Sequence, residues 1–243
     1  MLTRMAPEPD AVARYGALPD HVADVYTGTS TDRPLLMLIH GGYWRPDYDR
    51  THLRIFASGL ADAGWQVASI EYRRIPGDPD AMIDDVRSAI ALLPRQISHH
   101  NGSLLLIGHS AGGHLALWSA SAGASGARDI AGVIALAPVC DVAQADLLEL
   151  DGGAVRDFLG CAADERPDLD PMLLQPRVPI TLVHGDQDSL VPVEFSRRYL
   201  AAKAGLPVTL TLIPGVGHFE LIDPLSAAWP VVLSLITSSD NAY

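Results

Sequence analysis

A serine flanked by glycines lies where it could act as a nucleophile. Gly108, Ser110 and Gly112 form a G-x-S-x-G pattern between an apolar run at 103–109 and a helix-like stretch from 111 to about 122. Where a strand passes into a helix, this pattern places the serine on a sharp, strained turn with its hydroxyl above the sheet. The helix then directs free N–H groups toward developing negative charge. The spacing therefore predicts that Ser110 attacks a carbonyl carbon.

A serine hydroxyl is a weak nucleophile until a base removes its proton. The sequence offers His218 as this base, on a loop that follows the last apolar run, at 207–213. Gly215 and Gly217 give the loop the freedom to bring the imidazole over Ser110. We therefore predict that His218 is the general base.

The base needs an acid that fixes its tautomer and stabilises the imidazolium. The loop after the apolar run at 179–184 holds two aspartates, Asp186 and Asp188. We predict that Asp188, shortly before Val191-Pro192, is this acid. Asp186 is expected to hydrogen-bond loop backbone, as Asp often does in turns. Together the three residues predict a Ser-His-Asp triad.

The run HGGYW at 40–44 follows the first apolar run and supplies a place for an oxyanion. Backbone N–H groups of Gly41, Gly42 and Ala111 are the predicted donors, and which of the two glycines donates stays open. One such donor lowers the barrier by ~3–4 kcal/mol. The glycines also fit a tight turn that needs positive φ, which is compatible with the same role.

Three further residues are candidates for substrate binding: Tyr43, Trp44 and His109. Tyr43 and Trp44 could form an aromatic wall suited to an aryl substrate. Trp44 could equally pack under the loop and hold it rigid. His109 precedes the nucleophile, and packing or hydrogen-bonding support is its alternative role.

Alternating strand and helix patterns must position these residues. Apolar runs predict buried strands at 34–40, 65–72, 103–109, 130–137, 179–184 and 207–213. Helical patterns lie between and after them, at 49–63, about 83–93, 111–122, 193–203 and 223–236. This alternation predicts an α/β fold, a mostly parallel central sheet with helices on both faces and the site at the carboxyl ends of the strands. Residues 141–178 interrupt it and are predicted to form a small helical lid insertion within a single domain spanning 1–243.

Composition narrows the class of protein. The 243 residues carry a formal net charge of −12 and are 48% hydrophobic, which fits one domain with a large core. Clustered Lys and Arg are missing, so nucleic acid and membrane surfaces are not expected partners. Cys140 and Cys161 have no metal-ligand spacing, and we expect no metal and no cofactor. No secretory signal is recognisable, so we expect a cytoplasmic enzyme, for which a homodimer stays open.

The motifs resemble the hormone-sensitive-lipase-like branch of the α/β-hydrolases, and within it the kynurenine formamidase (arylformamidase) family. The family's HGGxW falls on His40, Gly41, Gly42 and Trp44, and the run EYR at 71–73 is similar to the branch's strand-end pattern. The N-terminal segments at 15–16 and 24–26 also resemble the family, whereas 141–178 matches nothing in it. The order Ser, Asp, His agrees with this fold.

The resemblance implies hydrolysis of a small-molecule ester or aryl formamide, N-formyl-L-kynurenine among them, through an acyl-enzyme. A short-chain carboxylesterase without formamidase activity is the alternative. A catalytically inactive, ligand-binding hydrolase scaffold is the remote one, because all of the motif residues are present.

Several charged residues could also serve substrate or structure. Arg73 and Arg74 could bind a substrate carboxylate or pair with Asp84 or Asp85. An acidic side chain of the insertion could bind a substrate ammonium, although a solvated surface is the expected role for most of them.

Overall fold

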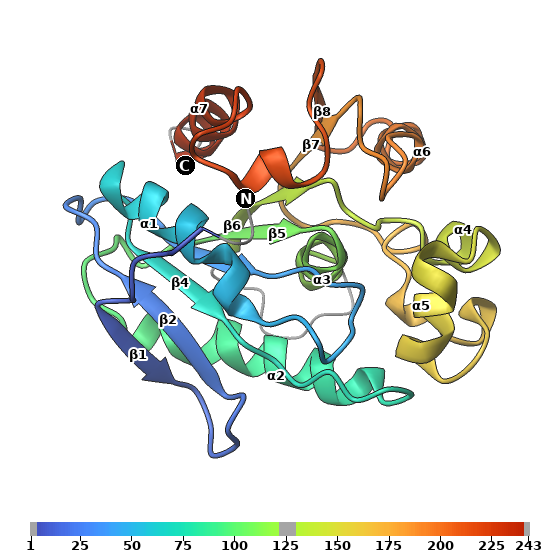
Figure 1. Ribbon diagram of the computed structural model, residues 1–243, viewed down its shortest axis with the longest axis horizontal. Helices are drawn as coiled ribbons and strands as arrows, with labels where there is room; N and C mark the ends of the chain where they lie inside the picture. The colour runs from blue at the N-terminus through green and yellow to red at the C-terminus, as the bar shows by residue number, and fades with distance from the viewer. Residues whose placement is uncertain (1–3, 122–129, 241–243) are drawn as a thin grey trace.

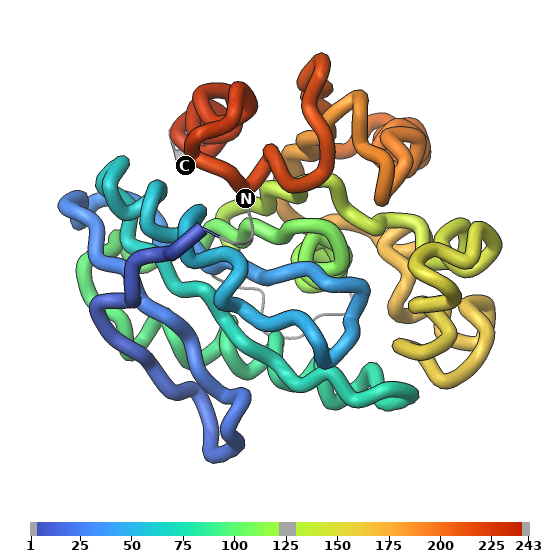
Figure 2. Tube along the Cα trace, in the orientation of Figure 1, coloured from blue at the N-terminus to red at the C-terminus, as the bar shows by residue number. Residues whose placement is uncertain are grey.

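The computed structural model describes residues 4–121 and 130–240 (Figure 1). Within these residues eight strands form one sheet in the order β1-β2-β4-β3-β5-β6-β7-β8. The two N-terminal strands, β1 (Ala11–Arg14) and β2 (Val22–Tyr26), are antiparallel to their neighbours. The remaining strands run parallel: β3 (Leu35–Ile39), β4 (Val67–Ile70), β5 (Leu104–His109), β6 (Ile130–Leu136), β7 (Ile180–Gly185) and β8 (Val208–Ile213). Figure 2 shows the chain crossing the sheet from blue strands at one edge to orange and red strands at the other.

The six predicted strands are confirmed. β3 to β7 are almost entirely buried, and strands covered on both faces appear as largely apolar runs, whereas β8 lies at the edge of the sheet and is partly exposed. The sequence patterns did not predict β1 and β2. β1 is a short, largely exposed edge strand. β2 is fully buried but contains Asp24, whose carboxylate is 2.9 Å from Nε of both Arg50 and Arg54. A charge inside a buried strand is tolerated because two arginines pair with it, and the sequence alone gave no sign of that pairing.

Helices cover both faces of the sheet, as predicted. α2 (Pro79–Leu92), α3 (Ala111–Ser119) and α6 (Glu194–Ala202) contribute to one apolar core. α1 (Arg54–Asp62) and α7 (Trp229–Asp240) contribute to the other. α1 and α2 accordingly lie on opposite sides of the sheet in Figure 1.

Several predicted helix boundaries differ from the structure. The helix expected over 49–63 starts as a 3₁₀ turn, η1 (Arg50–Leu53), and α1 begins only at Arg54, while α2 begins at Pro79 rather than at about 83. α3 ends at Ser119, and the predicted end at Ala122 lies outside the described residues. The C-terminal helix was expected over 223–236 but begins at Trp229. Pro224 disfavours helical backbone at the residue before it, and Asp223 and Ser226 form a turn there instead.

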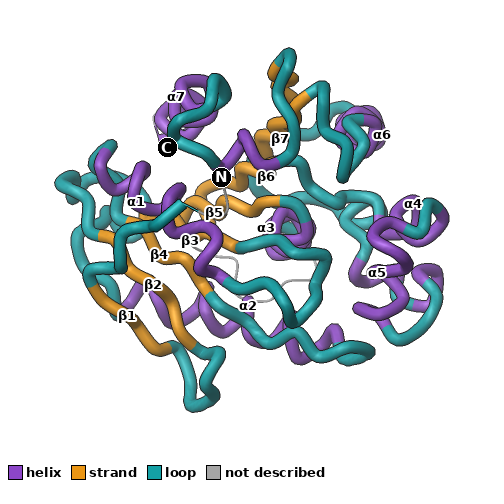
Figure 3. Tube along the Cα trace, in the orientation of Figure 1, coloured by secondary structure: helices purple, strands orange, loops and turns teal. Residues whose placement is uncertain are grey.

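The segment 141–178 is helical, as predicted. It contains α4 (Val142–Leu147), α5 (Leu150–Leu159) and two short 3₁₀ turns, η4 (Ala163–Glu165) and η5 (Pro167–Leu169). Figure 3 shows these purple helices grouped beside the sheet and joined by teal loops. We refer to 141–178 as the insertion.

Among the described helices, none is both long enough and apolar enough to cross a membrane.

Candidate active site

Ser110 lies at the turn between β5 and α3 with φ 57° and ψ −121°. This backbone conformation is rare for a residue with a side chain and costs on the order of 1–3 kcal/mol. The turn is held by backbone bonds, among them the Ser110 N–H to the Leu136 carbonyl at 2.9 Å. The neighbouring strand β6 therefore helps to maintain the strained conformation. Ser110 thus lies on the sharp turn that the motif predicted.

The glycines of the motif are required by close packing. A Cβ on Gly108 would lie 2.1 Å from the Gly112 carbonyl oxygen. A Cβ on Gly112 would lie 2.0 Å from the Ile39 carbonyl oxygen at the end of β3. Strand, helix and neighbouring strand thus meet without side chains between them, which explains both glycines.

His218 and Asp188 come together from two loops at the carboxyl ends of β8 and β7. Nδ1 of His218 is 2.6 Å from Oδ2 of Asp188. The other carboxylate oxygen, Oδ1, accepts the backbone N–H groups of Leu190 at 2.8 Å and Val191 at 2.9 Å. The carboxylate is thus fixed on one side by its own loop and presents the other side to the imidazole.

The electrostatics keep Asp188 ionised. Burial alone would raise its pKa, but the nearby imidazoles of His184 and His218 outweigh burial and hold the pKa well below its usual range. Nε2 of His184 lies 3.4 Å from Oδ2 of Asp188 and 2.9 Å from the Val191 carbonyl oxygen. An ionised Asp188 can accept a hydrogen bond from the His218 Nδ1–H and stabilise an imidazolium.

Asp186 has a different environment. Its Oδ1 accepts the backbone N–H of Gly215 at 2.7 Å, which ties its loop to the loop of His218. This is the backbone role that the sequence predicted for Asp186, and it places only Asp188 against the imidazole.

His109, directly before Ser110, is 2% exposed. Its Nε2 is 3.1 Å from the His218 carbonyl oxygen, and the two rings lie 4.5 Å apart between centroids. Burial first, and the neighbouring His218 second, lower the pKa of His109 well below its usual value, so its Nε2–H donates from a neutral ring. His109 was a candidate for substrate binding or, alternatively, for hydrogen-bonding support. The structure shows the second: His109, the residue before Ser110, binds the His218 backbone.

The HGGYW loop approaches the nucleophile from β3. A Cβ on Gly41 would lie 2.9 Å from Cβ of Ser110 and 3.6 Å from the Ala111 nitrogen. Gly42 has φ 111°, and a Cβ there would meet the Tyr48 side chain at 2.4 Å. Gly41 and Ala111 are therefore brought together beside Ser110, and Gly42 supplies the backbone turn.

The two aromatic residues of this loop point in different directions. Trp44 is buried, donates Nε1–H to Nδ1 of His114 at 3.2 Å and stacks on Phe158 of the insertion at 4.7 Å. Burial lowers the pKa of His114 to about 4, so its ring is neutral and can accept this bond. Trp44 thus packs under the loop, which was the second of its two predicted roles, rather than forming an aromatic wall beside Ser110. Tyr43 is partly exposed and donates its O–H to the Leu190 carbonyl at 2.9 Å.

A buried charge network supports the loop from below. Nε2 of His40 lies 3.1 Å from Glu71, and Nδ1 lies 2.8 Å from the Gly41 carbonyl oxygen. Arg74 pairs with the same Glu71 carboxylate, and Tyr72 donates its O–H to the His40 carbonyl at 2.7 Å. Burial works against ionisation of Glu71, but His40 and Arg74 outweigh it and hold its pKa well below the usual range.

The remaining charged candidates have protein partners. Arg73 pairs with Asp85 at 2.7 Å, which was one of its two predicted roles, and Arg74 pairs with Glu71 rather than with Asp84 or Asp85. In the insertion, Asp151 and Asp157 pair with Arg45 of the HGGYW loop at 2.7 and 2.9 Å. These acids thus connect the insertion to the loop rather than forming a purely solvated surface.

Sequence reasoning missed two residues that shape the site. His184, at the end of β7, is fully buried against the acid loop, and its only signal was its place just before Asp186. Phe158 gave no signal, because its contact with Trp44 joins residues more than a hundred positions apart.

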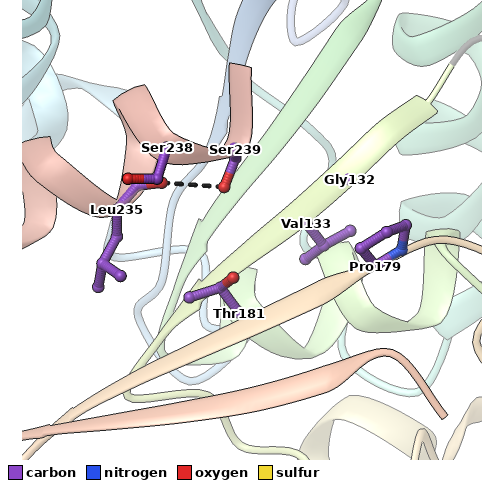
Figure 4. A pocket seen from close by; sticks show the side chains of 7 residues that line it. All are labelled: Gly132, Val133, Pro179, Thr181, Leu235, Ser238 and Ser239. Carbon is purple, nitrogen blue, oxygen red and sulfur yellow. Dashed lines mark hydrogen bonds between the residues drawn. The ribbon is translucent and has the colours of Figure 1, made fainter. Parts of the chain in front are cut away.

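A groove elsewhere on the molecule is remote from these residues. It lies between the first residues of β6 and β7 and the helix α7, and Gly132, Pro179, Thr181 and Leu235 line it (Figure 4). Ser110 follows the last residue of β5. Because the strands are parallel, this groove and the serine are at opposite ends of the sheet.

Comparisons with known proteins agree with the fold and the motifs. The model of the BD-FAE family matches residues 23–203. Kynurenine formamidase of Salmo salar is 30% identical over 236 residues, covering 87% of this chain and 75% of that protein. Esterase LipC of Mycobacterium tuberculosis is 28% identical over 243 residues, covering 86% of this chain and 59% of that protein.

Solved structures extend the agreement to the whole fold. The crystal structure of esterase B from Lactobacillus rhamnosis is similar with a TM-score of 0.81 at 23% identity, covering 98% of this chain and 88% of that chain. The resemblance to kynurenine formamidases that the motifs indicated is thereby confirmed, as is the predicted fold class. This chain belongs to the BD-FAE family and is a hydrolase with the α/β-hydrolase fold, related to the kynurenine formamidases.

Proposed function

We propose that this enzyme hydrolyses small carboxylic esters and aryl formamides through an acyl-enzyme on Ser110. The contact of 2.6 Å between Asp188 and His218 carries the proposal, together with the strained turn of Ser110, whose neighbour His109 contacts His218. A buried, ionised carboxylate on the far side of an imidazole fixes the tautomer whose Nε2 can take a proton from a serine.

The reaction follows from these positions. Ser110 Oγ forms a bond to the carbonyl carbon while His218 takes the hydroxyl proton, and the carbonyl electron pair moves onto oxygen. Backbone N–H groups of Ala111 and of Gly41 or Gly42 hold that oxyanion, each donor contributing ~3–4 kcal/mol. The oxyanion collapses, the bond to the leaving oxygen or nitrogen breaks, and His218 gives that atom its proton.

Water completes the cycle. His218 removes a proton from a water molecule, whose oxygen attacks the acyl carbon, and the Ser110 oxygen leaves and regains its proton. An ester yields an acid and an alcohol. An aryl formamide yields formate and an aniline, whose nitrogen is a better leaving group than that of an alkyl amide.

N-formyl-L-kynurenine is the specific formamide that we propose as substrate, because relatives named kynurenine formamidase match most of this chain. The match to an esterase of similar identity favours short-chain esters as a second substrate class. Measuring kcat/KM on N-formyl-L-kynurenine, p-nitrophenyl acetate and p-nitrophenyl butyrate separates the two. A preference for the formamide by orders of magnitude supports the formamidase, and turnover of the esters alone leaves a carboxylesterase.

The nucleophile is tested by Ser110→Ala, which we expect to lower turnover by on the order of 10³–10⁶ while the protein stays folded. Ser119→Ala is the matched control, because Ser119 is also buried in α3 but only donates to the Leu115 carbonyl at 2.7 Å. A fluorophosphonate should label the wild type and Ser119→Ala but not Ser110→Ala. Full activity in Ser110→Ala would exclude the proposed mechanism.

A further inference from the structure

Tyr43 connects the two sides of the candidate active site. Its backbone follows Gly42 directly, on the loop whose Gly41 approaches Ser110. Its hydroxyl donates to the carbonyl of Leu190 at 2.9 Å, on the loop that carries Asp188. One side chain thus spans from the predicted oxyanion donors to the acid loop.

Leu190 is also bonded to the proposed triad, through its backbone N–H. Its N–H donates to Oδ1 of Asp188 at 2.8 Å, and Oδ2 of that carboxylate is 2.6 Å from His218. The far end of the Tyr43 bridge is therefore two hydrogen bonds from the acid–base pair. Burial first, and then the negative charges of Asp151 and Asp188, raise the pKa of Tyr43 to about 12. The hydroxyl therefore keeps its proton and can donate it to the Leu190 carbonyl in a hydrogen bond.

The backbone is strained in a way that directs this side chain. Tyr43 and Trp44 have φ values of 50° and 58°, and both lie in the left-handed region that residues with side chains avoid. Trp44 is held there by His114 and by its stack on Phe158, and Arg45 is held by two aspartates of the insertion. Contacts on either side of Tyr43 thus maintain an unfavourable conformation whose result is the bridge.

The triad beneath this bridge is almost closed to solvent. Ser110 is 3% exposed and His218 is 6% exposed, although both must meet a substrate. Tyr43, at intermediate exposure, joins the loop of Gly41 to the loop of Asp188 through its bond to Leu190. A substrate that reaches Ser110 between these two loops must fit beside the phenol ring or displace its hydroxyl from Leu190.

We propose that Tyr43 is a specificity-determining residue that bridges the mouth of the active site and restricts it to compact substrates, with a small group on at least one side of the reacting carbonyl. This inference rests on the proposed function, since it concerns access to Ser110. A formyl or acetyl group satisfies the restriction, and a long acyl chain combined with a bulky leaving group does not.

The test is the size profile of Tyr43→Ala. One series of substrates keeps the p-nitrophenyl leaving group and lengthens the acyl chain from acetate to octanoate. A second series keeps the acetyl group and enlarges the alcohol. In Tyr43→Ala we expect kcat/KM for the largest member, relative to the acetate or smallest alcohol, to rise by about tenfold or more in at least one series.

Two further variants separate the ring from its hydrogen bond. Tyr43→Phe keeps the ring and loses the bond to Leu190, so its relative preference for large substrates should rise less than that of Tyr43→Ala. Leu148→Ala, at an exposed apolar residue of the insertion, is the control and should leave the profile unchanged. If Tyr43→Ala does not fold, Tyr43→Trp is used instead, and its larger ring should shift preference further toward the smallest substrate.

A profile that stays within about twofold of the wild type in both series, in a folded variant at Tyr43, would overturn the inference. Ser110→Ala is measured in parallel. Loss of activity in Ser110→Ala with an unchanged profile at Tyr43 removes only the role of Tyr43. Retained activity in Ser110→Ala removes the proposed function itself.

Discussion

The two loops that flank the proposed triad fix their functional groups in different ways. On the acid loop, the Asp188 carboxylate is fixed on one side by contacts close in sequence: its Oδ1 accepts N–H groups from Leu190 and Val191, and His184 lies 2.9 Å from the Val191 carbonyl oxygen. The HGGYW loop is stabilised by residues distant in sequence, with Glu71 beneath it and Phe158 of the insertion beside it.

This difference reflects what each loop must do. The acid loop presents one carboxylate, and a short turn with side-chain-to-backbone bonds suffices for that. The proposed oxyanion loop must hold backbone N–H groups in a fixed place while three consecutive residues, Gly42, Tyr43 and Trp44, adopt positive φ. Such strain persists only where the surrounding structure maintains it, so the insertion and the Glu71 network are part of the site.

The largest effect is expected on the acid loop. Asp188→Asn should lower kcat by about 10⁴, because an amide no longer fixes the His218 tautomer or stabilises the imidazolium. Asp186→Asn, two residues away, should leave kcat near the wild-type value, since Asp186 accepts from the Gly215 N–H and the Gln187 side chain and not from His218. Steady-state kinetics of both variants check the assignment, and the reverse ranking would show that Asp186 is the acid.

An intermediate effect is expected beneath the oxyanion loop. Glu71→Gln removes one partner of a buried charge network and should lower the free energy of unfolding by about 3 kcal/mol. The displaced loop should also lower kcat about 10- to 100-fold with little change in KM. The pKa of Glu71 is below its ordinary 4.5 in the folded protein, so the unfolded chain binds more protons as the pH falls. The stability gap between wild type and variant should therefore be constant above about pH 4.5 and narrow below it.

Asp85→Asn is the matched control for Glu71→Gln. Asp85 is also buried and paired with an arginine, Arg73, but Arg73 and its second ion-pair partner, His21, both lie outside the HGGYW loop. Both variants should lose stability in urea unfolding, and only Glu71→Gln should lose kcat. An equal loss of kcat in the two variants would mean that Glu71 acts through general stability alone.

The smallest effect is expected where the insertion meets the loop through exposed charges. Asp157→Asn removes one of the two acidic partners of Arg45 and should change stability by less than about 1 kcal/mol, because both groups are solvated. Asp84→Asn, which breaks the exposed pair with Arg87, should have the same small effect. Thermal unfolding and steady-state kinetics compare the two variants. If Asp157→Asn lowers stability and kcat several times more than Asp84→Asn, the ion pairs of Arg45, rather than the stack of Trp44 on Phe158, attach the insertion to the loop.

The sequence by itself determined the fold class and the local features of the site. Strands buried on both faces are largely apolar runs, so β3 to β7 were predictable on that ground, and the partly exposed β8 was predictable from its β-branched and apolar residues. The G-x-S-x-G spacing predicts the strained turn of Ser110 from neighbouring residues alone. The choice of Asp188 over Asp186 also came from its position in the loop, although the partners that distinguish them, His218 and Gly215, lie 30 and 29 positions away.

Only the tertiary structure decided what holds the oxyanion loop and where its aromatic side chains point. The charge of Asp24 kept the sequence pattern from predicting β2 as a buried strand, because the arginines that pair with Asp24 lie elsewhere in the chain. The sequence allowed Trp44 either to line the site or to pack under the loop, and its stack on Phe158 decides for packing. Tyr43 reaches Leu190 across 147 positions of chain. Contacts of that range depend on how separate elements pack, and no local pattern of residue types records the packing.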